Sequence, residues 1–132
     1  KNRIDIALLL IRLAFGSMMI YEHGWGKLMR FFADEPIKFG DPLGIGTIPS
    51  LGLAVFSEVF CAFMLIIGLL TRWVSIPLIV TMSVAAFMVH IDDPFSKMEK
   101  ALLYLVPYIV LLLMGAGKYS LDYLWFKDKK FV

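Results

Sequence analysis

Residues 51–70 constrain the fold more than any other part of the chain. They form an unbroken apolar stretch, LGLAVFSEVFCAFMLIIGLL, in which Glu58 alone is charged. A stretch of this length matches the ~20 residues that an α-helix needs to cross the hydrocarbon core of a bilayer. Placing a charged group at the centre of such a helix costs about 2.5 kcal/mol or more. We therefore expect Glu58 to face protein and to have a partner elsewhere in the chain.

The composition agrees with a membrane protein. Of the 132 residues, 60% are hydrophobic and 18% are charged, whereas soluble domains are about half apolar and a quarter charged. The net charge of +2 is small and no basic run is interleaved with aromatic residues, so nothing indicates a nucleic-acid partner. The single cysteine, Cys61, excludes an intramolecular disulfide and a CxxC redox pair. We interpret it as a small buried side chain.

The length suits one domain of four spans. We predict these spans at residues 6–28, 51–70, 73–89 and 100–114. The turn at residues 68–73 is so short that the second and third spans should be antiparallel neighbours. The predicted fold class is therefore all-α: an integral membrane four-helix bundle with antiparallel up-down topology.

Two of the segments outside the predicted spans have a distinctive composition. The long first connection, residues 29–50, contains three prolines and three glycines that interrupt any helix, and both a lid and a plain surface loop fit it. The C-terminal segment, residues 118–132, mixes aromatic residues with lysines. We predict that it is a short amphipathic tail on the membrane surface.

The basic residues predict an orientation. The side that holds both termini and the second turn carries seven of the thirteen Lys and Arg residues, the other side carries five, and Arg12 lies within the first span. Because cytoplasmic loops carry an excess of Lys and Arg, we expect both termini to be cytoplasmic in a multi-pass protein.

Arg12 is the predicted partner of Glu58. At about 1.5 Å per residue, Arg12 lies roughly 12 Å from one side of the membrane and Glu58 roughly 12 Å from the other. In a core ~30 Å thick their Cα atoms would differ in height by ~6 Å, which two long side chains can bridge. We predict a buried ion pair. Such a pair also has a purely structural interpretation, since it can fix helix order and register without any chemistry.

A second group of polar residues is expected at the opposite end from the termini. His23 and His90 each end a span that runs in that direction, and Lys27 fits either this group or an interfacial anchor. Two histidines on separate spans, without motif spacing, are a weak signal for metal or haem, so we predict no metal site. We expect instead a polar pocket whose candidate residues are His23, Lys27, Glu58, His90 and Tyr104.

A quinone suits such a pocket. Its carbonyl oxygens need hydrogen-bond donors, its protons need a histidine or carboxylate, and its tail needs access to lipid. No covalently bound cofactor is implied, and a bound quinone is the expected ligand.

Three stretches resemble a known family. They are Leu9–Leu28, Glu58 with the following Gly68–Arg72, and Gly115–Asp122. In these the chain is similar to the DoxX family of small four-helix bacterial membrane proteins. The resemblance implies a bacterial cytoplasmic (inner) membrane protein and a quinone-proximal site at the residues named above. The family is named for the membrane subunits of a thiosulfate:quinone oxidoreductase, and other members are linked to thiol or oxidative stress.

The leading hypothesis is a quinone-associated subunit of a membrane oxidoreductase complex, inactive alone and linked to sulfur, thiol or oxidative-stress chemistry. Its expected partners are the lipid bilayer and other membrane or peripheral redox subunits, or further copies of itself. One alternative is a non-enzymatic accessory or assembly subunit with a purely structural Arg12–Glu58 pair. A second is a small proton-coupled carrier, for which Glu58 is the one positive sign and no inverted repeat is visible.

Overall fold

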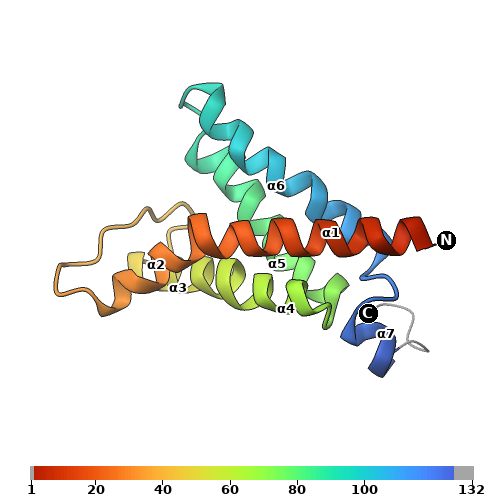
Figure 1. The fold of residues 1–132 in the computed structure, drawn as a ribbon. Helices are drawn as coiled ribbons and strands as arrows, with labels where there is room; N and C mark the ends of the chain where they lie inside the picture. The colour runs from red at the N-terminus through yellow and green to blue at the C-terminus, as the bar shows by residue number, and fades with distance from the viewer. Residues whose placement is uncertain (1, 127–132) are drawn as a thin grey trace.

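The computed structural model describes residues 2–126, and every regular element in that range is a helix (Figure 1). The first continuous helical stretch consists of α1 (Asn2–Met19), η1 (Ile20–Gly24), α2 (Trp25–Met29) and η2 (Arg30–Phe32). The second consists of α3 (Thr47–Val55), η3 (Phe56–Cys61) and α4 (Ala62–Ile67). The third consists of α5 (Thr71–Val84) and η4 (Ala85–Val89), followed by α6 (Phe95–Met114) and α7 (Leu121–Phe126). Of the η segments, η1, η3 and η4 are π-helical and η2 is a 3-10 helix.

Three of these stretches are long and apolar enough to cross a membrane. They are the first span (Asn2–Phe32), the second span (Thr47–Ile67) and the third span (Thr71–Val89). The predicted spans 6–28, 51–70 and 73–89 overlap them closely. The helix α6 has 20 residues, but Lys97, Glu99 and Lys100 occupy its first turns and leave only residues 101–114 free of charge. This uncharged part is shorter than the ~20 residues of a typical spanning helix.

The long helices are arranged in two pairs. The first and second spans lie side by side, and the pair formed by α5 and α6 runs obliquely to them (Figure 1). The first half of α6 leads away from α1, toward the turn that joins it to η4 (Figure 1). The chain reverses between α4 and α5 at Gly68 and Leu70, which both adopt left-handed backbone angles, with φ of 72° and 52°.

Two glycines set how the first and second spans pack. A Cβ atom added to Gly16 would lie 3.0 Å from the carbonyl oxygen of Ala62, and one added to Gly24 would lie 2.6 Å from the carbonyl oxygen of Glu58. Only glycine allows so close an approach of two backbones. The core beside this contact is apolar and includes Cys61, which is 1% exposed. These two contacts fix the register of the spans.

The first part of the predicted C-terminal tail, which contains α7, packs partly against the rest of the protein. Asp122 in α7 is buried, and its carboxylate accepts hydrogen bonds from the backbone amides of Leu70 (2.6 Å) and Thr71 (2.9 Å). Those amides have no partner within α5, because the first turn of a helix leaves its N–H groups free. Asp122 therefore caps α5 from a distant part of the chain, while Trp125 in the same helix is exposed. The remainder of the predicted tail, residues 127–132, lies outside the described residues.

Candidate functional site

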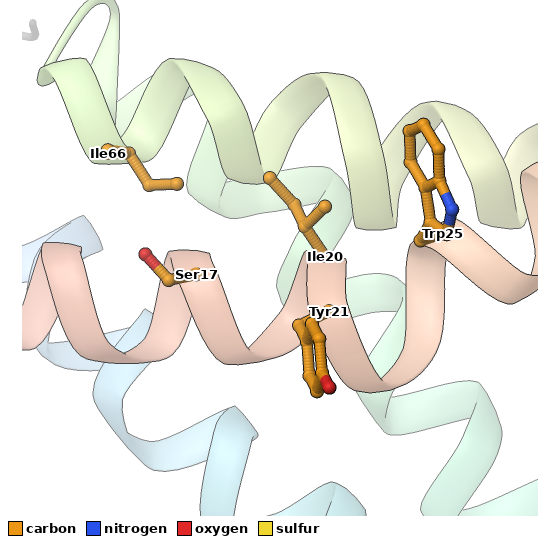
Figure 2. A pocket seen from close by; sticks show the side chains of 5 residues that line it. All are labelled: Ser17, Ile20, Tyr21, Trp25 and Ile66. Atoms are coloured by element: carbon orange, nitrogen blue, oxygen red, sulfur yellow. The ribbon is translucent and has the colours of Figure 1, made fainter.

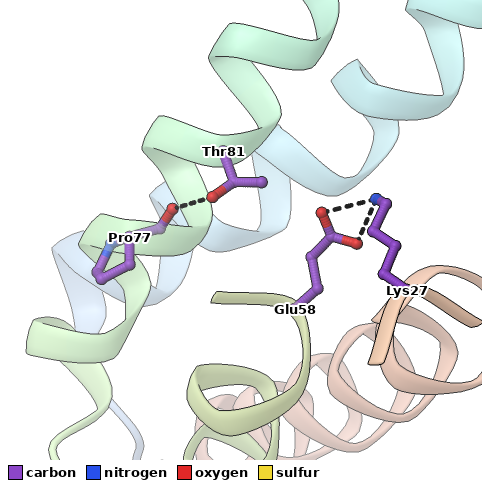
Figure 3. A network of polar contacts seen from close by, with 4 residues as sticks. All are labelled: Lys27, Glu58, Pro77 and Thr81. Atoms are coloured by element: carbon purple, nitrogen blue, oxygen red, sulfur yellow. Dashed lines mark hydrogen bonds and ion pairs between the residues drawn. The ribbon is translucent and has the colours of Figure 1, made fainter. Parts of the chain in front are cut away.

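Glu58 is paired with Lys27. The Lys27 ammonium donates to both carboxylate oxygens of Glu58, at 2.6 and 2.9 Å (Figure 3). The Glu58 side chain is 2% exposed and that of Lys27 is 23% exposed. The third span lies on the other side of the carboxylate, where the Thr81 hydroxyl donates to the carbonyl of Pro77 (Figure 3). The expectation that Glu58 has a partner is met, but the predicted Arg12–Glu58 pair is wrong.

Register explains this correction. Because the first two spans pack with Gly24 against Glu58 and Gly16 against Ala62, Arg12 lies opposite Gly68. That is ten residues beyond Glu58, or ~15 Å along a helix. Lys27 follows Gly24 by three residues, about one helical turn, which places it at the level of Glu58.

Arg12 is instead bound by main-chain carbonyls. It is fully buried, and its guanidinium donates to the carbonyls of Leu65 (3.4 Å), Ile66 (3.0 Å) and Tyr119. The first two lie in the last turn of α4, where the macrodipole favours a cation and the Gly68 amide is a further donor to Leu65, at 3.1 Å. We call Arg12 with these three carbonyls the Arg12 cap.

Aromatic residues border the Lys27–Glu58 pair on the side of α6. The rings of His23 and Tyr104 meet edge to face, with centroids 5.2 Å apart, and Phe15 meets Tyr104 in the same way at 5.8 Å. The Tyr108 hydroxyl donates to the carbonyl of Phe15 at 2.9 Å, which ties α6 to α1 here. His23 lies within the electrostatic reach of both Lys27 and Glu58. The structure thus brings together four of the five predicted pocket residues.

His90 is the member that lies elsewhere. It follows η4 in the turn before α6, and its Nδ1 atom lies 2.7 Å from a carboxylate oxygen of Asp93. This contact, helped by the nearby Lys97, lowers the pKa of Asp93. Because α5 and α6 run obliquely to the first span, their shared turn lies well away from η1 (Figure 1). The predicted grouping of His90 with His23 is therefore wrong. Within residues 2–126, no three His, Cys, Asp or Glu side chains are grouped as metal ligands.

The connection between the first two spans folds over Lys27. The ring of Phe39 lies 5.9 Å from the Lys27 ammonium and 5.5 Å from the Arg30 guanidinium, as in cation–π contacts. Arg30 also donates to the carbonyl of Lys38 at 3.3 Å. Neither Phe39 nor Asp122 was among the predicted site residues. The aromatic residues of this loop were a signal for Phe39, whereas nothing local marks Asp122 as the cap of a helix 50 residues earlier.

Asp41 organises the second half of the same loop. Its carboxylate accepts hydrogen bonds from the amides of Ile45 (2.9 Å) and Gly46 (2.8 Å) and from the Ser50 hydroxyl (2.8 Å). The Ser50 hydroxyl, followed by the Gly46 amide, lowers the pKa of Asp41 because these bonds favour the carboxylate. The loop is thus held at Phe39 and again at Asp41, next to the start of α3.

An open pocket of about 430 Å³ lies elsewhere on the first span (Figure 2). Its lining residues are Ser17, Ile20, Tyr21, Trp25 and Ile66. None of them is charged, and the pocket contains none of the residues of the Lys27–Glu58 pair or its aromatic border. It offers few groups for binding a polar ligand.

Comparison with known proteins gives a family match and two relatives. The DoxX family model matches residues 7–91, which include Arg12, Lys27 and Glu58 but not Tyr104 or Asp122. A Haemophilus influenzae protein described as uncharacterized is 32% identical over 126 residues, covering 89% of this chain and 82% of the relative. Another from the same organism, also described as uncharacterized, is 31% identical over 124 residues, with 89% of each chain covered. No solved structure gives a significant match.

Proposed function

Because the chain belongs to the DoxX family of membrane proteins, we propose that it is a quinone-associated subunit of a membrane oxidoreductase complex. Sulfur, thiol or oxidative-stress redox chemistry would take place on partner subunits, since this chain contains no CxxC pair. The observation that carries the proposal is the buried Lys27–Glu58 pair, with His23 and Tyr104 beside it.

The side chains at this pair fit the needs of a quinone head group. A quinone supplies electron-accepting chemistry, taking up two electrons and two protons as it becomes a quinol. Lys27 offers an ammonium donor for a carbonyl oxygen, and Glu58 and His23 hold and release protons. The opposite charges of Lys27 and Glu58 reduce the cost of placing either one below the membrane surface. Tyr104 adds a hydroxyl donor on the facing helix.

The proposal includes a topology. We place α6 as the fourth span of an antiparallel up-down bundle, with Lys97, Glu99 and Lys100 at the membrane surface. The N-terminus of α1 and the α7 helix lie at the same end of the molecule, which supports an even number of crossings (Figure 1). The excess of Lys and Arg at that end supports a cytoplasmic location for both termini in a bacterial inner membrane.

Quinone binding to the purified protein in lipid nanodiscs tests the proposal. We expect Glu58→Gln and His23→Ala each to weaken binding of a short-chain ubiquinone about tenfold or more, which corresponds to ~1.4 kcal/mol. Glu99→Gln, an exposed carboxylate on α6, is the matched control and should bind as the wild type does. Wild-type affinity in both site variants would remove Glu58 and His23 from the site. Native mass spectrometry of the protein released from its own membrane should show a quinone or a stoichiometric redox partner.

A non-enzymatic accessory role is the second candidate, and the Arg12 cap favours it. The cap uses the longest polar side chain of the core to hold α4 and the segment before α7 together, and each of its hydrogen bonds goes to a main-chain carbonyl. If the Lys27–Glu58 pair is also purely structural, a Lys27→Met, Glu58→Met double variant should retain full biological function. Loss of function in a stably folded double variant would favour the quinone site.

A further inference from the structure

The Lys27–Glu58 pair is closed on two sides. Toward the loop end of the molecule, the Phe39 ring lies over Lys27. Toward the second span, the backbones of Gly24 and Glu58 are so close that a single added Cβ atom would lie 2.6 Å from the Glu58 carbonyl oxygen. A ligand as large as a quinone ring has no room to pass between these two backbones.

The side that faces α6 is different, because it is lined by polar groups that are not fully buried. Glu22 and Lys100 are exposed, and His23 and Tyr104 are partly exposed. Lys100 and Tyr104 are four residues apart on α6 and so share one face of that helix. The charges of Glu22 and Lys100 both act on His23, and the Tyr104 ring brings this face of α6 to within 5.2 Å of the imidazole, between ring centroids.

The charges on this side of the pair are exposed and lie close to where the proposed spans reach the membrane surface. Neither Glu22 nor Lys100 has a salt-bridge partner among the described residues. This side of the protein therefore suits contact with a polar molecule that itself resides in the membrane.

We propose that the quinone of this site enters sideways from the lipid, between η1 and the first half of α6, and that Lys100 binds its head group. The inference rests on the proposed quinone function. Figure 1 shows the first half of α6 leading away from the first span, and Glu22 in η1 is exposed. Lys100 shares a face of α6 with Tyr104, whose ring meets His23, and its ammonium is a donor for a carbonyl oxygen. The apolar tail of the ligand stays in lipid throughout entry.

Site-specific blocking tests the entry side. Cys61 is buried, so a cysteine introduced at an exposed position is the one that a bulky maleimide labels. We would compare Glu22→Cys, at the proposed entry, with Lys38→Cys, on the loop next to Phe39, each with and without label. Labelled Glu22→Cys should bind decylubiquinone at least tenfold more weakly than its unlabelled form, and labelled Lys38→Cys should be unchanged. A loss at Lys38→Cys equal to or larger than that at Glu22→Cys would overturn sideways entry.

Lys100 is tested separately, with Lys97 as the matched control. Lys97 lies one turn earlier on the same face of α6, nearer to Asp93. Lys100→Gln should weaken decylubiquinone binding about three- to tenfold, whereas Lys97→Gln should not, and equal affinities of the two variants would remove Lys100 from the site. Failure of the proposed function itself would give a different result. In that case the unmodified wild-type protein would bind no quinone in the same nanodiscs.

Discussion

The molecule binds two basic side chains of its first span in opposite ways. Every hydrogen bond of Arg12 goes to a main-chain carbonyl, and the side chain is 0% exposed. Both hydrogen bonds of Lys27 go to one titratable side chain, and 23% of the Lys27 side chain is exposed. Arg12 is therefore inaccessible to solvent, whereas Lys27 remains partly accessible from outside the protein.

This difference separates structural from chemical roles. A main-chain carbonyl neither takes up a proton nor leaves its place, so the Arg12 cap is suited to holding α4 and the segment before α7 in position. A carboxylate can gain a proton and release its partner, and the charge of Glu58 acts on the neighbouring His23. A buried charge is therefore not by itself evidence of a reactive site. Its partners decide which role it has.

The largest effect should follow from removing the Arg12 cap. Arg12→Met leaves the carbonyls of Ile66 and Tyr119 unpaired, at about 1–3 kcal/mol each, or ~4 kcal/mol in all, whereas the Leu65 carbonyl keeps the Gly68 amide as a donor. Denaturant titration in detergent should show this loss, while Arg3→Met, an exposed residue of the same helix, should change the free energy of unfolding by less than ~0.5 kcal/mol. A stable Arg12→Met protein would contradict a structural role for the cap.

The Lys27–Glu58 pair should respond differently to single and double substitution. Lys27→Met leaves Glu58 buried without its partner and should cost about 3–5 kcal/mol, and the Lys27→Met, Glu58→Met double variant should recover most of that loss. The same unfolding titration measures both variants. If the double variant is no more stable than Lys27→Met, the cost arises from lost packing of the lysine side chain and not from an unpaired carboxylate.

A smaller effect is expected where glycine makes room for Arg12. Gly68 has φ of 72°, and a Cβ atom added there would lie 2.5 Å from a guanidinium nitrogen of Arg12. Gly68→Ala should therefore destabilise the fold by at least ~1 kcal/mol, from the left-handed backbone alone. The control is Gly26→Ala in α2, where no atom lies within 4 Å and alanine favours the helix by ~1 kcal/mol. Thermal unfolding of the two variants should shift in opposite directions.

The sequence predicted the spans better than the contacts between them. Hydropathy identifies residues 51–70 because crossing lipid depends on composition, and the observed second span overlaps most of that range. The partner of Glu58 depends on register, which the close backbone contacts of Gly16 and Gly24 decide and hydropathy does not express. The position of His90 depends on the oblique course of α5 and α6, which is a property of tertiary packing.

The smallest predicted effect concerns the loop that covers Lys27. The stability of this loop should depend on pH, whereas that of the Arg12 cap should not. The pKa of Asp41 in the folded protein lies below its ordinary value of 3.8, so its carboxylate contributes stability above that pH. This contribution is lost as the pH falls through the lowered pKa, when protonation removes the acceptor for Ile45, Gly46 and Ser50.

Hydrogen exchange measured by mass spectrometry at several acidic pH values, after correction for the intrinsic exchange rate, should show protection of residues 41–50 falling in the wild type. Asp41→Asn, which does not titrate, should show lower protection that does not vary with pH. Protection of the segment before α7, which holds the Tyr119 carbonyl bound by Arg12, should not follow this transition. If protection fell at the same pH in both segments, acid would be unfolding the whole molecule. Asp41 would then not stabilise the loop locally.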